Sequence, residues 1–212
     1  MRSHLKKISN ELLKHNLDGY LCSDFKDLYY ALEYPGRDAW LLIVPDKAYY
    51  LTDSRYTLQV RQELRGKVCI RELKQSLAQT CFDIVRQKKI KRLGFDERHF
   101  SVAAFKAVKK ACPSGVRLVP ANQLVERLRM IKDAQELDQI RQCLSLQKTA
   151  ITYLKRTIRA GLSEQDILEK LRDFVHHQGA KFSFLPIIAS GPNSSFPHAS
   201  VSSRKIGKND PV

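Results

Sequence analysis

The sequence predicts an α/β protein built around a mixed sheet, followed by a second part that begins with long helices. In residues 1–122, short runs rich in β-branched and aromatic residues alternate with segments whose apolar residues recur at helical spacing. Such alternation is typical of a sheet with helices packed on its faces. Beyond residues 121–125 the pattern changes to long helical repeats with little Gly or Pro. We therefore predict two domains, residues 1–122 and residues 123–212.

The first domain is expected to open with a helix, because Leu5, Ile8, Leu12 and Leu13 follow helical spacing. Strands are predicted at residues 20–23, 39–45, 48–53, 67–73, 92–96 and 116–121. Helices are predicted at residues 54–64, 76–90 and 101–112, the first of them with Ser54 as its N-cap.

The second domain is expected to contain helices that lead into a strand. The long helical pattern breaks at Asp133, a candidate N-cap with Glu136 at the spacing of a capping box. Ser163 is expected to cap a further helix, which Gly179 ends. Residues 181–190, KFSFLPIIAS, have the composition of a strand.

Composition narrows the class of protein and its location. The 43% of hydrophobic residues is typical of a globular core, and no apolar run approaches the roughly 18 residues of a membrane span. The N-terminus, MRSHLKKISNELLKHNLDG, lacks the apolar centre of a secretory signal. The five cysteines are scattered, without a C-x-x-C pair. We therefore expect a cytoplasmic protein with reduced thiols and no membrane partner.

The net charge of +15 raises the question of a polyanionic partner. The basic excess is spread along the chain, and its densest run, RQKKIKR at residues 86–92, joins a helical pattern to a strand-like one. A solvated basic surface accounts for this distribution better than a focused nucleic-acid site, although the charge leaves such a partner open.

His198 is the candidate catalytic residue. An apolar run delivers it into a loop whose Gly and Pro residues restrict the backbone, IIASGPNSSFPHAS at residues 187–200. A neutral imidazole there can donate a hydrogen bond to a substrate carbonyl and help to stabilise a developing oxyanion. A lone loop histidine can equally be structural or merely exposed.

Other chemistries find weaker support in the sequence. Ser190, Ser194 and Ser195 lie near His198, but the chain lacks a G-x-S-x-G elbow, and nothing places Asp210 beside the histidine. The glycine motifs that cradle phosphate are absent. The adjacent histidines of the preceding helix diverge by about 100° around its axis, so we predict no metal site in this chain.

Several motifs occur in a recognisable order. YYLTDSRYTLQV at residues 49–60 contains D-x-R-Y, and LRMIKDAQELDQIRQC at residues 128–143 has the form R-x-x-K-[DS]-x-x-E-[LI]-x-x-[IM]-[RK]. A G-x-[ST]-E helix start at residues 161–164 is followed by Ser-Phe, I-x-A-S-G-x-N-S and P-H-A. Over nearly its whole length the chain thereby resembles the creatinase/aminopeptidase P/prolidase family, the pita-bread metallopeptidases.

The resemblance implies an N-terminal creatinase-type α/β domain with a mixed sheet, followed by the first part of a pita-bread catalytic domain. It implies a Xaa-Pro-type metallo-aminopeptidase or dipeptidase that works as a homodimer on peptides with proline at the second position. In this family a hydroxide activated by two divalent ions, manganese, cobalt or zinc, attacks the N-terminal peptide bond. His198 matches the P-H-A histidine, which contacts the substrate without binding metal, and Phe184 is expected to contact the substrate as well.

The resemblance also implies that the family's metal ligands, two aspartates, a histidine and two glutamates, lie beyond Val212. We therefore expect this chain to be a fragment that binds neither ion and has no peptidase activity alone. The alternative is a non-catalytic relative that acts as a binding module for protein or nucleic acid, which the charge of +15 favours.

Overall fold

The computed structural model describes residues 3–212, which form two compact units that divide between Lys132 and Asp133. This division lies further along the chain than the boundary predicted near residue 122. The reason is that Leu124 and Val125 of the intervening helix are buried in the core of the first unit. Within residues 3–212, no helix combines the length and the apolar character that crossing a membrane requires.

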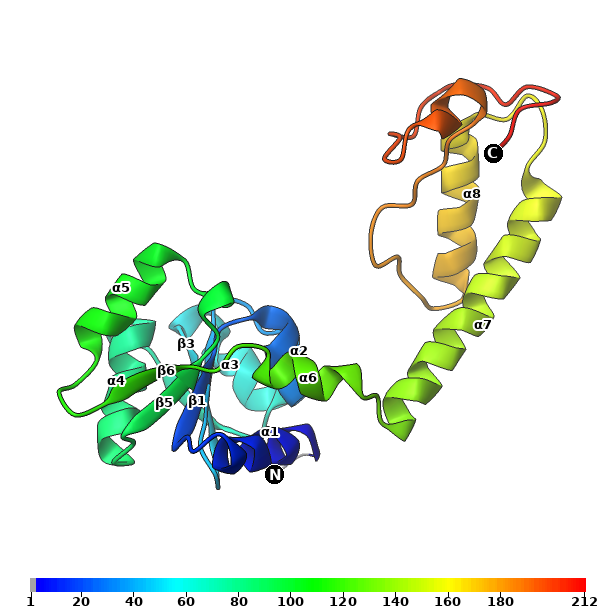
Figure 1. Cartoon of the computed structure of the whole chain (residues 1–212). Coiled ribbons are helices and arrows are strands. Elements are labelled where there is room, and N and C mark those ends of the chain that lie inside the picture. Colours follow the sequence, from blue (N-terminus) through cyan, green and yellow to red (C-terminus); the bar gives the residue numbers. More distant parts are fainter. Residues whose placement is uncertain (1–2) are drawn as a thin grey trace. The chain divides into compact units, whose positions relative to one another are not determined.

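The first unit alternates strands and helices, as the sequence predicts (Figure 1, blue to green). Its elements are α1 (Ser3–Lys14), β1 (Gly19–Cys22), α2 (Phe25–Leu32), β2 (Trp40–Ile43), β3 (Ala48–Thr52), α3 (Ser54–Glu63), β4 (Cys69–Glu72), α4 (Leu77–Gln87), β5 (Arg92–Phe95), η1 (Glu97–His99), α5 (Val102–Ala111), β6 (Arg117–Pro120) and α6 (Leu124–Met130).

The strands form one six-stranded sheet in the order β4-β3-β2-β1-β5-β6. Strand β2 runs antiparallel to both of its neighbours, with Leu21 of β1 opposite Leu42 and Tyr50 of β3 opposite Leu41. The pairs β3–β4, β1–β5 and β5–β6 are parallel. The prediction of an α/β fold with a mixed sheet is therefore confirmed.

Helices cover both faces of the sheet because successive strand residues point to opposite sides. In β2, Leu41 and Ile43 pack with α1, α2, α3 and α6, whereas Leu42 packs with α4. Figure 1 shows α4 and α5 on one side of the sheet and α1, α2 and α6 on the other. The carboxyl end of β5, next to that of its parallel neighbour β1, lies beside the start of α6: the backbone N–H of Gln123, the N-cap of α6, donates to Asp96 Oδ2 at 3.0 Å.

Two local predictions for the first unit need correction. Ser54 is the first residue of α3 and does not cap it; the N-cap is Asp53, whose carboxylate accepts the backbone N–H of Arg55 at 2.9 Å. Helix α2 was not predicted, although Asp24 caps it by accepting two backbone N–H groups. In both cases the N-cap is an aspartate, which is a strong N-cap residue.

The second unit contains α7 (Ala134–Thr157), α8 (Glu164–His177) and the short η2 (Gly191–Ser195). The predicted capping box of Asp133 and Glu136 is present at the start of α7, and Ser163 caps α8. Gly179 follows α8 with a φ of +70°, a left-handed conformation that favours glycine. The rings of Tyr153 and Phe174 stack at 4.6 Å and join the two helices.

The strand predicted at residues 181–190 is not formed within the described part of the chain. The described segment is irregular, bends at residues 183–184 and belongs to no sheet, and Phe184 and Leu185 are exposed. Ile188 is buried against α8, so only part of the apolar run reaches the core of the unit.

Candidate functional site

The start of α8 lies beside the C-terminal segment of the chain. The backbone N–H groups of Glu164 and Gln165 donate to the carbonyls of Arg204 at 3.1 Å and Ser202 at 3.2 Å. The same two segments are also joined just before the helix, where the backbone N–H of Ile206 donates to the carbonyl of Leu162 at 2.8 Å. The first N–H groups of a helix have no partner within the helix, and here residues 202–206 supply acceptors for them.

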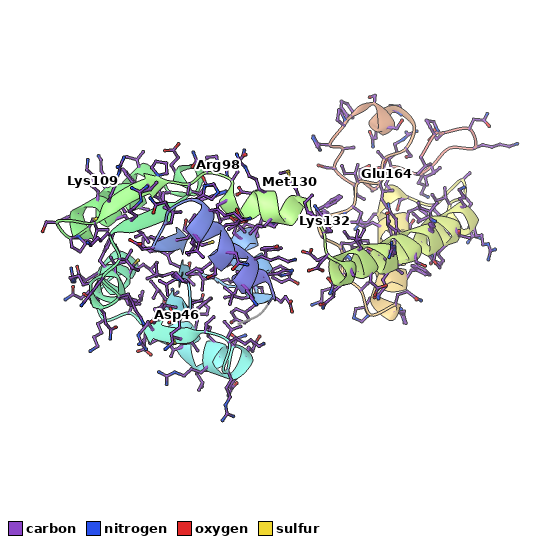
Figure 2. The ribbon with its side chains drawn as sticks, turned by 60° about the horizontal axis from the view of Figure 1, so that its bottom comes forward. Asp46, Arg98, Lys109, Met130, Lys132 and Glu164 are labelled. Atoms are coloured by element: carbon purple, nitrogen blue, oxygen red, sulfur yellow. The ribbon has the colours of Figure 1, made fainter. Side chains whose placement is uncertain are left out.

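Glu164, the first residue of α8, is fully buried and accepts hydrogen bonds from five donor atoms. Its Oε1 atom accepts the N–H of Ser190 at 2.7 Å, the Ser190 hydroxyl at 2.9 Å and Asn193 Nδ2 at 3.0 Å. Its Oε2 atom accepts the N–H of Ser202 at 3.0 Å and the Ser202 hydroxyl at 2.7 Å. Figure 2 labels Glu164 where α8 meets this segment.

These donors keep the carboxylate of Glu164 ionised. Burial raises the pKa of Glu164, but hydrogen bonds from Ser202, Ser190 and Asn193 outweigh it and lower that pKa to about 2. Donors that stabilise the charged form of a carboxyl group have this effect. Glu164 is therefore a fixed acceptor at neutral pH and not a proton-transfer group.

Arg204 closes the other side of the loop. Its Nε–H donates to the carbonyl of Ser190 at 3.1 Å, and its Nη2 lies 2.6 Å from Asp210 Oδ2. Gly191 has a φ of +51°, and a Cβ atom there would lie 2.5 Å from Arg204 Nη2. The glycine of the S-G-x-N-S motif is thus required both by its backbone conformation and by the close approach of the guanidinium group.

The loop fixed in this way presents His198 to solvent. His198 makes no hydrogen bond or ion pair within residues 3–212. Phe184, the other predicted substrate contact, is 74% exposed, and no interaction recorded for the described residues joins it to His198. The structure shows that both side chains are accessible, and their role in binding a substrate stays a prediction.

The serine hydroxyls near His198 are committed to the loop itself. Ser194 donates to the carbonyl of Gly191 at 2.6 Å, and Ser195 donates to that of Pro192 at 2.8 Å. Together with the bonds from Ser190 to Glu164 and from Arg204 to Asp210, they leave no serine–histidine–aspartate arrangement among the described residues. The sequence argument against a serine nucleophile therefore has a structural reason.

A second polar cluster, which the sequence did not predict, lies in the first unit at the carboxyl ends of β1 and β5. Asp24 and Asp96 follow those two parallel strands, and His99 lies 3.6 Å from Asp24 Oδ1 and 3.3 Å from Glu126 Oε1. Asp27 is buried and accepts from Arg129 at 2.9 Å. Carboxyl ends of parallel strands meet at one sheet edge, a signal that could have located this cluster.

Charge within this cluster is already paired. Arg98 bonds to both Asp96 and Glu126, the latter at 2.5 Å. Burial, with Glu126 nearby, raises the pKa of Asp27 to about 6 despite its bond from Arg129. Asp24, Asp27 and His99, and likewise Asp96, His99 and Glu126, are close enough to share an ion, but Arg98 already bonds to Asp96 and Glu126 and Arg129 to Asp27.

The described residues of the second unit offer no comparable set of metal ligands. Within residues 133–212 taken alone, no three histidine, cysteine, aspartate or glutamate side chains converge. A two-metal site needs several such ligands around the ions. The side chains described in this unit do not fit one.

Comparison with known proteins gives the family. The creatinase/prolidase N-terminal domain matches residues 4–131, and the metallopeptidase family M24 matches residues 138–212. The chain is 32% identical over 209 residues to the uncharacterized peptidase YqhT of Bacillus subtilis, which covers 98% of this chain and 59% of that protein.

Two solved structures are similar over most of the chain. A Xaa-Pro dipeptidase from Bacillus anthracis matches with a TM-score of 0.84 and 26% identity, covering 98% of this chain and 58% of that one. An X-Pro aminopeptidase from Thermotoga maritima matches with a TM-score of 0.80 and 27% identity, covering 95% and 58%. The chain thus spans less than two thirds of the length of these relatives. On its sequence motifs, its mixed sheet and these matches, the chain belongs to the creatinase/prolidase family, whose relatives are Xaa-Pro peptidases.

Proposed function

We propose that the protein takes part in hydrolysis of the N-terminal peptide bond of peptides that carry proline at the second position, as a Xaa-Pro-type aminopeptidase or dipeptidase. The observation that carries the proposal is the exposed His198 on a loop whose S-G-x-N-S and P-H-A motifs are held in place by Glu164. The names of the relatives, a Xaa-Pro dipeptidase and an X-Pro aminopeptidase, support the same reaction.

The role proposed for this chain is recognition of the peptide. His198 donates a hydrogen bond to the carbonyl oxygen of the scissile bond and stabilises negative charge there. The exposed ring of Phe184 offers an apolar contact for the side chains of the peptide. Two divalent ions such as manganese, cobalt or zinc would supply the attacking hydroxide, and the described side chains of residues 133–212 do not fit them.

The experiment is a kinetic comparison on the native protein purified from its source with manganese. We expect hydrolysis of alanyl-proline by the native protein, and a loss of about 10²- to 10³-fold in kcat for His198→Ala, the size of effect seen when an oxyanion donor is removed. The metal content of the variant, measured by mass spectrometry, should match that of the native protein. Wild-type turnover by His198→Ala would contradict the role of the histidine.

A binding module for nucleic acid is the second candidate, because the chain carries a net charge of +15. Such a module would bind DNA or RNA with an affinity that falls steeply as salt increases. Absence of binding at low salt, together with hydrolysis of alanyl-proline, would leave the peptidase as the function.

The proposed homodimer is open to a direct measurement of molar mass in solution.

A further inference from the structure

Among the described residues, no cationic side chain bonds to the buried carboxylate of Glu164. All five of its donor atoms belong to Ser190, Asn193 and Ser202. The nearby guanidinium group of Arg204 donates to the Ser190 carbonyl and to Asp210 instead. An ionised group placed in the interior without an ion pair needs such a set of donors, because burial alone strongly disfavours its charge.

The two carboxylate oxygens of Glu164 serve opposite ends of one loop. Oε1 accepts from Ser190 and Asn193, where the loop begins, and Oε2 accepts from Ser202, where it ends, and more weakly from Asn193 Nδ2 at 3.3 Å. The residues between them include His198. One side chain thus ties together the two ends of the segment that presents the histidine.

The other contacts between the two ends of this loop also lie outside residues 194–201: Asn193 Nδ2 lies 3.3 Å from Ser202 Oγ, and Arg204 Nε–H donates to the Ser190 carbonyl at 3.1 Å. The hydroxyls of Ser194 and Ser195 bond only within η2, and residues 194–198 are all exposed. Buried apolar anchors lie outside the loop, at Ile188 before it and Ile206 after it. The position of His198 therefore depends on how the ends of the loop are held.

Glu164 is unsuited to a direct part in catalysis. Both of its oxygens are filled by protein donors, and the side chain is inaccessible to solvent. A general base or a metal ligand needs a free lone pair that faces the reacting group. Its contribution is made through the loop.

We propose that Glu164 is the positioning residue of the His198 loop: its carboxylate clamps residues 190 and 202 together and thereby sets where the imidazole stands. This inference rests on the proposed function for the identity of the substrate that His198 meets. Glutamine is a sharp test of the clamp, because its amide group has nearly the same shape but replaces one acceptor oxygen by a donor.

The experiment compares the wild-type chain of 212 residues with Glu164→Gln by NMR. Glu169→Gln, an exposed glutamate of the same helix, is the matched control. We expect the amide exchange of Ser190 and Ser202 to accelerate by about 10- to 100-fold in Glu164→Gln, since each loses a charged acceptor. The imidazole signals of His198 should shift, while the amides of Leu171 and Val175 in α8 keep their wild-type exchange rates.

Wild-type exchange at Ser190 and Ser202, with unmoved His198 signals, would overturn the proposal. If Glu164→Gln instead accelerates exchange throughout α8, the decisive variant is Ser202→Ala, which keeps the carboxylate and removes one of its donors. A shift of the His198 signals in Ser202→Ala supports the clamp, and unmoved signals there refute it.

A titration with alanyl-proline separates this inference from the proposed function. The wild-type His198 signals should move as the dipeptide binds, and the apparent dissociation constant should rise about tenfold in Glu164→Gln because the imidazole is no longer pre-positioned. If the dipeptide leaves the wild-type signals unchanged, the substrate is wrong, and the exchange data still decide whether Glu164 holds the loop.

Discussion

Asp27 in the first unit and Glu164 in the second are both buried carboxyl groups, yet their pKa values move in opposite directions. Asp27 has a bond from Arg129 but lies near Glu126 and Asp24, and its pKa rises to about 6. Glu164 has five donor atoms, and its pKa falls to about 2. Burial opposes ionisation at both sites, so the number of donors and the presence of like charges decide the outcome.

The largest expected effect is the loss of stability of the second unit in acid. The pKa of Glu164 lies below its ordinary value of 4.5, so the unfolded state takes up the proton first as the pH falls. The stabilisation is complete above pH 4.5 and is lost as the pH falls toward 2, about 3 kcal/mol at 1.4 kcal/mol per pKa unit. Amide exchange of Ser190 and Ser202, measured at a series of pH values, reports this loss. Constant protection of both amides down to pH 2 would contradict it.

Asp27→Asn tests the opposite sign in the first unit. The pKa of Asp27 lies above its ordinary value of 3.8, so the folded state holds the proton more tightly and its stability falls as the pH rises through 6. The asparagine removes this penalty, and we expect a gain of about 3 kcal/mol at pH 7, at about 1.4 kcal/mol per pKa unit, that vanishes below pH 3.8. Urea denaturation at both pH values measures it. Asp46→Asn, at an exposed aspartate (Figure 2), is the control and should change little.

Ser202→Ala removes one donor and so makes Glu164 more like Asp27. The lost hydroxyl bond should cost about 1 kcal/mol of unfolding free energy and raise the pKa of Glu164. Carbon-13 NMR of the carboxyl group follows the pKa directly. Ser203→Ala, at the exposed neighbour, should leave that titration where it is, and an equal shift in both variants would rule out the hydroxyl as the cause.

Glu126→Gln removes a like charge and so makes Asp27 more like Glu164. The pKa of Asp27 should fall toward its ordinary value, because Glu126 is the nearby carboxylate that most disfavours its ionisation. The unfolding free energy should change by less than about 1 kcal/mol, since Glu126 is also bonded to the partly exposed Arg98. An unmoved Asp27 titration would show that burial alone raises the pKa.

The sequence predicted the strands and helix caps, which depend on residues close together along the chain. The strands of the sheet and the caps at Asp133 and Ser163 follow from patterns a few residues long. The cap of α3 was assigned to Ser54 because serine and the adjacent Asp53 are both good N-cap residues, and only the backbone shows which one precedes the helix. Strand composition at residues 181–190 predicted an element that also needs a pairing partner, and the described chain offers none.

The missed features all join distant parts of the chain. Glu164 was visible only as part of a helix start, since its partners Ser190 and Ser202 lie 26 and 38 residues away. Asp27 and Arg129 are separated by 102 residues. No local pattern connects such pairs, so the contacts of Glu164 and the polar cluster required the fold, whereas the P-H-A motif alone was enough to predict His198 as a site residue.

The carbonyl groups of residues 202 and 204 that receive the first N–H groups of α8 have a consequence for the order of folding. Helices α7 and α8 are adjacent in sequence and can pack by local contacts, which form early because the intervening loop is short. The beginning of α8 and the carboxylate of Glu164 have to wait for a segment made about 40 residues later, because their partners lie there. During synthesis, the carboxylate of Glu164 therefore stays hydrated at least until residues 190–202 have been made, because those residues carry all of its donors.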